Sequence, residues 1–124
     1  MPATQRAIEV FKQKTENHVP IIHYAKGSGH LHSCIREFDI KAISLDWRDD
    51  LSQNRQQFGN DIAFQGNLDP SYMHGSVETA KQATIDVLNA AGDKPGHIFN
   101  LGHGFAPSAK IDCVEAVLRT ITEG

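Results

Sequence analysis

Short apolar stretches alternate with amphipathic stretches along this chain, and this alternation limits the folds open to it. Apolar, β-branched runs predict strands at 19–24, 42–45, 62–65 and 97–101. Apolar residues at helical spacing predict helices at 4–15, 30–38, 49–58, 76–91 and 112–122. Strands that alternate with helices form βαβ units, in which the strands pair in parallel through right-handed crossovers. The sequence therefore predicts an α/β fold around one parallel sheet.

Capping residues mark several of the predicted helix ends. Thr4 and Asp112 are predicted N-caps, because short oxygen-bearing side chains accept hydrogen bonds from the free N–H groups of a first turn. Gly59 is typical of a residue that ends a helix. Asp69 followed by Pro70 is typical of a helix start, with Asp as N-cap and Pro at the first helical position. We interpret this pair as structural.

Bulk composition indicates one soluble globular domain covering residues 1–124. The chain has 124 residues, of which 40% are hydrophobic, and a net charge of -3. No dense Lys/Arg stripe is present, which argues against nucleic acid or an anionic membrane as a partner. No apolar run is long enough to span a bilayer, and the N-terminus does not resemble a signal peptide. Cys34 and Cys113 form no CxxC pair, so we expect a cytoplasmic, reducing location.

Polar or ionisable residues follow every predicted strand. In a parallel sheet, functional groups gather beyond the carboxyl ends of the strands, so these residues are expected to lie along one edge. The candidates are His23, Lys26, Asp46, Trp47, Gln65, Asn67, Asp69, Asn100 and His103. Their common placement is stronger evidence for a site than any single motif.

His103 stands between two glycines directly after the last predicted strand. Gly102 and Gly104 carry no side chains, so the backbone can turn sharply there and a ligand can approach the imidazole closely. The apolar run before them is typical of a parallel strand that is covered on both faces. The alternative interpretation is a strand that ends in a glycine turn with an incidental histidine.

The carboxylate and the cation nearest the strand ends leave alternatives open. Asp46 is interpreted either as a catalytic carboxylate or, with more weight, as a positioning residue that accepts hydrogen bonds from backbone or Arg. Trp47 is expected to be a wall residue rather than a ligand stacker. Lys26 can meet an anionic substrate, but its loop does not match a phosphate-binding motif.

His30, His32 and Cys34 alternate along the chain and carry side chains that can bind zinc. Residues two apart do not share a face of a helix. No matching ligand pair stands elsewhere at a usual spacing. The sequence therefore predicts no metal site.

Three motifs and one further segment together resemble a known family. The motifs are ISLDW at 43–47, FQGNLDP at 64–70 and IFNLGHG at 98–104, and the segment is VPIIHYAKG at 19–27. They resemble the C-terminal part of uroporphyrinogen decarboxylase. The resemblance implies a TIM-type (β/α)8 barrel, which needs about 250 residues, so this chain is expected to supply roughly half of one.

The resemblance also implies a chemistry. The family converts uroporphyrinogen to coproporphyrinogen in haem biosynthesis by removing the carboxyl groups of the acetate arms, without a metal or organic cofactor. His103 matches the family's histidine that contacts substrate, and the other expected site-lining residues are Asp46, Asn67, Asn100, Gly102 and Gly104. The family's remaining apparatus, which includes arginines, an aspartate, a tyrosine and a serine, belongs to its N-terminal part. The isolated chain is therefore expected to be inactive.

Two local departures from the family pattern affect loop details only, and two alternative functions stand beside the resemblance. Ser108 stands where the family usually has Asp, and 38–41 replaces a glycine-containing turn. Related cobalamin-linked methyltransferases carry a zinc-binding His-x-Cys at the strand that here gives His23, Tyr24 and Ala25, and alanine counts against that branch. The other alternative is a binding or interaction module without catalysis. Because a half barrel leaves open sheet edges, we expect a homo-oligomer or a complex with an N-terminal half.

Overall fold

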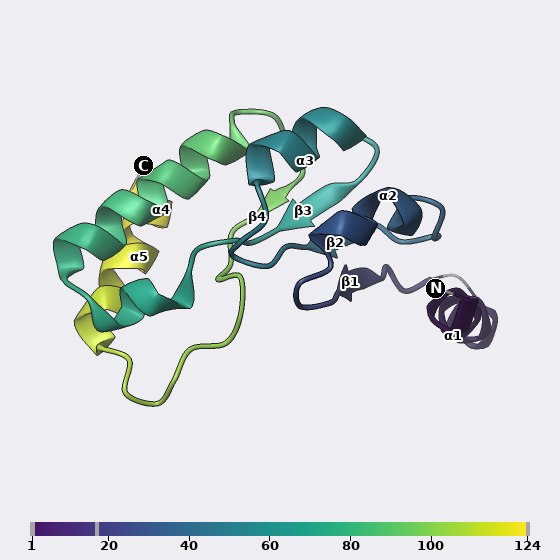
Figure 1. The fold of residues 1–124 in the computed structure, drawn as a ribbon, viewed down its shortest axis with the longest axis horizontal. Helices are drawn as coiled ribbons and strands as arrows, with labels where there is room; N and C mark the ends of the chain where they lie inside the picture. The colour runs from purple at the N-terminus through teal and green to yellow at the C-terminus, as the bar shows by residue number, and fades with distance from the viewer. Residues whose placement is uncertain (1, 17, 124) are drawn as a thin grey trace.

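The computed structural model describes residues 2–16 and 18–123 and shows helices around one parallel sheet (Figure 1). The sheet has four strands in the order β1-β2-β3-β4, and every neighbouring pair is parallel. This confirms the predicted α/β fold.

The strands are β1 (Ile22–Tyr24), β2 (Ala42–Ser44), β3 (Ala63–Gln65) and β4 (His97–Ile98). The helices are α1 (Pro2–Lys14), η1 (Gly29–Leu31), α2 (His32–Ile35), α3 (Leu51–Phe58), η2 (Pro70–His74), α4 (Val77–Ala91) and α5 (Ile111–Glu123).

The two faces of the sheet differ because side chains alternate along each strand. His23, Ile43 and Phe64 share one row of the register and face the helices. The next row, which includes Tyr24 and Ile98, faces the other way. Ile98 is 44% exposed, so the prediction that this strand is covered on both faces is wrong for the described chain. The helices cover one face only, and an open sheet of four strands cannot cover its own other face.

Two apolar clusters hold the elements together. The first lies behind β1, β2 and β3 and includes Ile35, Ile43, Phe58 and Phe64. Phe58 and Phe64 meet edge to face with ring centroids 5.6 Å apart, a favourable aromatic geometry. The second cluster packs η2, α4 and α5 together and includes Leu68, Met73, Ala80, Cys113 and Val117. Since both clusters reach the segments that follow the strands, they fix the edge on which the candidate residues stand.

Several predicted boundaries need correction. The strand predicted at 19–24 begins only at Ile22, because Pro20 has no N–H to pair. The helix predicted at 30–38 is divided into η1 and α2 and ends at Ile35. The strand predicted at 97–101 ends at Ile98, and Leu101 pairs with Leu68 through a single bridge.

Two of the predicted N-caps are also wrong. Thr4 lies inside α1, which begins at Pro2, a residue favoured in the first turn. Asp112 lies inside the first turn of α5, where its charge still complements the helix dipole. The structural reading of Asp69 is confirmed, because its side chain accepts a hydrogen bond from the Ser71 N–H at 2.8 Å and Pro70 follows it. The predicted helix end at Gly59 is confirmed as the C-cap of α3.

Two partly buried histidines predict how stability changes with pH. Burial lowers the pKa of His23, helped by the nearby His32, and burial likewise lowers the pKa of His97. A lowered pKa in the folded state means that the unfolded chain binds protons first as pH falls. The contribution of the two neutral histidines to the free energy of unfolding is therefore complete above the unfolded pKa of about 6.5. It is lost as pH falls below that value. The urea midpoint is expected to be lower at pH 5 than at pH 7.

Variants test this pH dependence directly. His23→Leu should make the urea midpoint change less between pH 5 and pH 7, because a group that titrates differently in the two states is gone. His74 is exposed, and His74→Ala is the matched control. An unchanged pH dependence in His23→Leu would contradict this assignment for His23.

Candidate functional site

A cavity of about 700 Å³ opens at the carboxyl ends of the strands, on the sheet face that the helices do not cover. This volume is within the usual range for sites that hold a small molecule. β1, β2 and β3 contribute one or two residues each, and the segment after β4 contributes the rest. The lining residues are Ile22, Tyr24, Ser44, Gln65, Asn100, Leu101, Gly102, His103, Gly104 and Phe105. Of the nine residues predicted to gather along this edge, Gln65, Asn100 and His103 line the cavity.

His103 lies between two aromatic rings at the mouth of this cavity. Its ring centroid is 5.9 Å from that of Trp47 and 6.3 Å from that of Tyr24, and both pairs meet edge to face. The Nδ1 atom is 3.2 Å from the Gly104 carbonyl oxygen. The two aromatic rings fix the orientation of the imidazole. Because His103 is exposed, the remaining side of its ring is available to a ligand.

Tyr24 is a cavity residue that the sequence analysis did not single out. Its hydroxyl donates a hydrogen bond to the Gly102 carbonyl oxygen at 3.3 Å, which joins β1 to the segment after β4. Burial raises the pKa of Tyr24, and the negative charge of Asp46 adds to this effect. The phenol therefore stays protonated and can donate. The sequence does hold one indication of its position: side chains alternate along a strand, which places Tyr24 on the same face as Ile22.

Asp46 is buried beneath the site and acts as a positioning residue. Its Oδ1 accepts from the Arg48 N–H at 3.1 Å and Nε at 2.9 Å, and its Oδ2 accepts from the Arg48 guanidinium at 2.7 Å and the Gly27 N–H at 3.0 Å. The Arg48 guanidinium and the backbone donors hold the pKa of Asp46 well below its usual range, although burial opposes them. Of the two readings left open, this geometry favours positioning.

Asn67 also joins segments and does not line the cavity. Its Nδ2 donates to the Asp46 carbonyl oxygen at 2.9 Å and to the Asp49 carbonyl oxygen at 2.6 Å. Of the six residues expected to bind substrate or line the site, the structure brings four together around the cavity: Asn100, Gly102, His103 and Gly104. Asp46 and Asn67 instead hold the loops behind them.

Cationic groups gather around Trp47, which does not line the cavity itself. The Lys26 ammonium lies 5.4 Å and the Arg48 guanidinium 4.7 Å from the centroid of the indole ring. Both distances are within the range of cation–π attraction. Lys26 is exposed and can approach an anion held beside His103.

His30, His32 and Cys34 do not come together in the fold, since His30 and Cys34 are exposed and His32 is buried. His32 is buried, and its Nδ1 lies 2.8 Å from Asn54 Oδ1, whereas Cys34 is exposed. Over residues 2–16 and 18–123, no group of three His, Cys, Asp or Glu side chains is placed to hold a metal ion. His23, from the methyltransferase comparison, faces the helices and packs edge to face against Phe38 at 6.3 Å.

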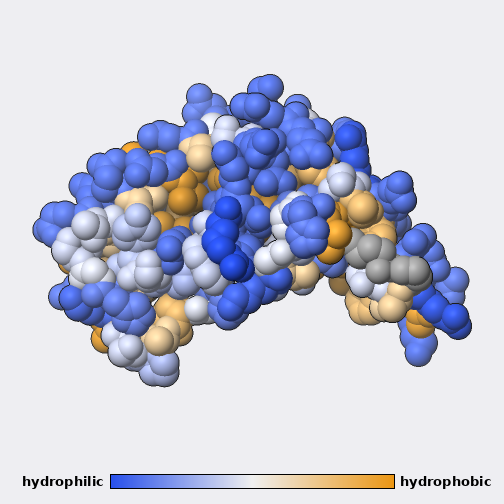
Figure 2. Space-filling model, in the orientation of Figure 1, coloured by the Kyte–Doolittle hydropathy of each residue, from blue (hydrophilic) through white to orange (hydrophobic). Residues whose placement is uncertain are grey.

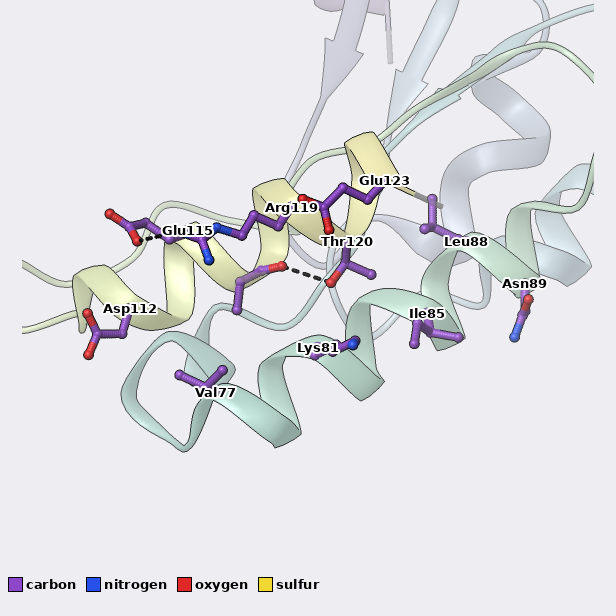
Figure 3. Close-up of a pocket in the computed structure, with 11 residues that line it drawn as sticks. Val77, Lys81, Ile85, Leu88, Asn89, Asp112, Glu115, Arg119, Thr120 and Glu123 are labelled. Carbon is purple, nitrogen blue, oxygen red and sulfur yellow. Dashed lines mark hydrogen bonds and ion pairs between the residues drawn. The ribbon is translucent and has the colours of Figure 1, made fainter.

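A second hollow of about 840 Å³ lies between α4 and α5 (Figure 3). Its lining comes entirely from these two helices, with Lys81 and Ile85 on one side and Arg119 and Thr120 on the other. It contains no strand-end residue and no histidine. Although it is the larger hollow, none of the residues that follow the strands lines it, so the strand-end cavity is the candidate site.

Comparisons with known proteins identify the family of this chain. The family described as uroporphyrinogen decarboxylase (URO-D) matches residues 1–124. The chain belongs to the uroporphyrinogen decarboxylase family. It is 37% identical over 118 residues to a uroporphyrinogen decarboxylase of Coxiella burnetii, with 95% of this chain and 33% of the relative covered. It is 40% identical over 105 residues to that of Magnetococcus marinus, with 85% and 30% covered.

The chain spans about a third of the length of the uroporphyrinogen decarboxylases that it matches. Its four parallel strands fit part of a TIM-type barrel, the fold expected for this family. The chain is thus a smaller part of these relatives than the half predicted from the usual length of such a barrel. No helix in the described ranges has the length and apolar character needed to cross a membrane.

Proposed function

We propose that this chain is the C-terminal, His103-bearing part of a uroporphyrinogen decarboxylase, folded as a single half-barrel domain over residues 1–124. The observation that supports this proposal best is His103, held between Tyr24 and Trp47 at the mouth of the strand-end cavity. The relatives that carry this name supply the substrate class. The reaction would belong to haem biosynthesis and take place in the cytoplasm, where the free Cys34 and Cys113 stay reduced.

Polar and apolar residues of the cavity would bind different parts of such a substrate. Uroporphyrinogen carries many carboxylates around an apolar macrocycle, so a site for it needs hydrogen-bond donors beside apolar walls. His103 donates to one carboxylate, and Asn100 and Gln65 present amide donors on the same cavity wall. Ile22, Leu101 and Phe105 supply apolar contact for the ring system. Decarboxylation itself requires proton transfer to a pyrrole carbon and, after loss of CO2, to the new methyl carbon.

Uroporphyrin binding tests the role of His103. The chain has one tryptophan, and its ring lies beside His103, so bound porphyrin should quench its fluorescence. His103→Ala is expected to raise the dissociation constant about tenfold, because a hydrogen bond to a charged group is lost. His74→Ala is the control, since His74 is exposed outside the cavity. Equal affinity of His103→Ala and the unmodified chain would contradict the proposed site.

The isolated chain is expected to lack decarboxylase activity. The described cavity residues include a histidine and amides but no arginine and no carboxylate. We propose that turnover needs a partner, either an N-terminal half or further copies of the chain. Assay of coproporphyrinogen should detect none with the chain alone and a recovered rate when the N-terminal part of a relative is added. Failure of that addition to give any turnover favours the alternative of a binding module without catalysis.

A further inference from the structure

Two layers of side chains lie on the cavity face of the sheet, and they differ in polarity. Side chains alternate along a strand, so residues two apart share a face. The lower layer joins apolar register partners of β1, β2 and β3: Ile22, Ala42 and Ala63. The layer at the carboxyl ends joins mostly polar register partners of all four strands: Tyr24, Ser44, Gln65 and Ile98. The cavity face thus changes from apolar to polar where the strands end.

The polar layer lies inside the molecule and not on its outer surface. Figure 2 shows hydrophilic side chains over most of one face of the molecule, so polar residues on the outside are ordinary. In contrast, Ser44 is only 9% exposed and Gln65 is half-buried, and both line the strand-end cavity. Burial of a polar group costs free energy unless the group is hydrogen-bonded. Ser44 and Gln65 meet this need in part by binding each other.

The bond between these two side chains leaves a matched pair of donors. Gln65 Nε2 donates to Ser44 Oγ at 3.2 Å, across the β2–β3 pair. An amide nitrogen carries two hydrogens and a hydroxyl carries one, so each residue keeps one hydrogen that this bond does not use. The two atoms that carry these hydrogens are therefore 3.2 Å apart. A carboxylate has two acceptor oxygens on one carbon and can accept from both donors at once.

The pair is electrically neutral, and this suits a carboxylate that reacts. Among the described residues, no lysine or arginine lines the cavity. In decarboxylation the C–C bond to the carboxyl group breaks, its electron pair passes into the protonated pyrrole, and CO2 leaves uncharged. A fixed cation beside that carboxylate would stabilise the charged substrate more than the transition state. Neutral donors bind a carboxylate less strongly than a cation does and oppose this step less.

We propose that Ser44 and Gln65 form a subsite for the carboxylate of an acetate arm, and that this subsite distinguishes substrate from product. The subsite rests on the proposed function, since uroporphyrinogen supplies the acetate arms. Coproporphyrinogen carries methyl groups in their place, so only the substrate can use these two donors. His103 is exposed at the mouth and stays available for a carboxylate that both compounds carry.

Binding of uroporphyrin and coproporphyrin, which carry the arms of the two porphyrinogens, tests the subsite through the fluorescence of Trp47. The unmodified chain is expected to bind uroporphyrin more tightly. Ser44→Ala removes one donor and the partner of Gln65, so the dissociation constant of uroporphyrin should rise about tenfold and that of coproporphyrin less than about twofold. Gln65→Met removes the amide at similar length and should act in the same way. Ser108→Ala and Gln57→Met are the matched controls, because both residues are exposed and neither lines the cavity.

The ratio of the two dissociation constants separates a role in binding from a role in folding. A variant that only disturbs the fold raises both constants together, and that result for Ser44→Ala would overturn the subsite. An unchanged uroporphyrin constant in Ser44→Ala, or equal binding of both porphyrins by the unmodified chain, would do the same. His103-dependent uroporphyrin binding without a Ser44-dependent preference removes the acetate subsite alone. A Ser44-dependent preference without His103 dependence removes the proposed role of His103 alone, and the absence of any porphyrin binding removes both.

Discussion

Gly102→Ala is expected to remove most His103-dependent uroporphyrin binding and to lower the free energy of unfolding by about 2 kcal/mol, as overpacking commonly does. Gly102 is buried where the segment after β4 meets the segment after β2. A Cβ atom there would meet the Trp47 backbone nitrogen and lie 2.6 Å from Trp47 Cα. Backbone atoms cannot rotate away as a side chain can. One of the two segments must therefore move.

That movement acts on His103 through its neighbours. The Gly102 N–H donates to the Leu68 carbonyl oxygen at 2.8 Å, and the Gly102 carbonyl accepts from Tyr24. Separation of Gly102 from Trp47 would also withdraw His103 from the Trp47 ring that orients it. Gly104→Ala is the matched control, because a Cβ at Gly104 has nothing within 4 Å. Urea unfolding and quenching of Trp47 fluorescence should separate the two variants, and equal behaviour would contradict this account of Gly102.

The parallel sheet was predictable because its signals are local. The run that contains Ile43 and the run that contains Phe64 are apolar and short, and each is followed by an amphipathic helix. Alternation of this kind leaves few topologies other than a parallel sheet. The same argument places Asn100 and His103 at the carboxyl edge, because every strand in such a sheet points the same way.

The contacts that build the site were not predictable from local pattern. The hydrogen bond from Tyr24 to Gly102 joins residues 78 apart in sequence, and no spacing rule encodes it. The sequence left Asp46 open as a catalytic carboxylate or a positioning residue, because its role depends on where Gly27 and Arg48 lie in the fold. Ile98 shows the same limit, since an apolar strand residue has one sequence signature whether its face is covered or open.

Asp46→Ala is expected to lower the free energy of unfolding by about 3 kcal/mol, since buried donors would lose their acceptor. The Asp46 side chain is 0% exposed, whereas that of Arg48 is 55% exposed. The Gly27 N–H and the Arg48 N–H both donate to this carboxylate, so its removal frees the loop after β1 from the end of β2. Asp61→Ala is the matched control. Its carboxylate is 80% exposed and 3.5 Å from Arg36, and its loss should cost less than about 0.5 kcal/mol.

The change of the urea midpoint at acid pH distinguishes the role of the Asp46 carboxylate from a general loss of packing. Arg48 and the backbone donors lower the pKa of Asp46 in the folded state, so the unfolded chain binds the proton first as pH falls. Its stabilisation is complete above the unfolded pKa of about 3.9 and is lost as pH falls below it. Urea midpoints measured between pH 5 and pH 2 should fall less steeply in Asp46→Ala than in the unmodified chain. An equally steep fall in both proteins would show that Asp46 does not anchor the loops beneath His103 as an ionised group.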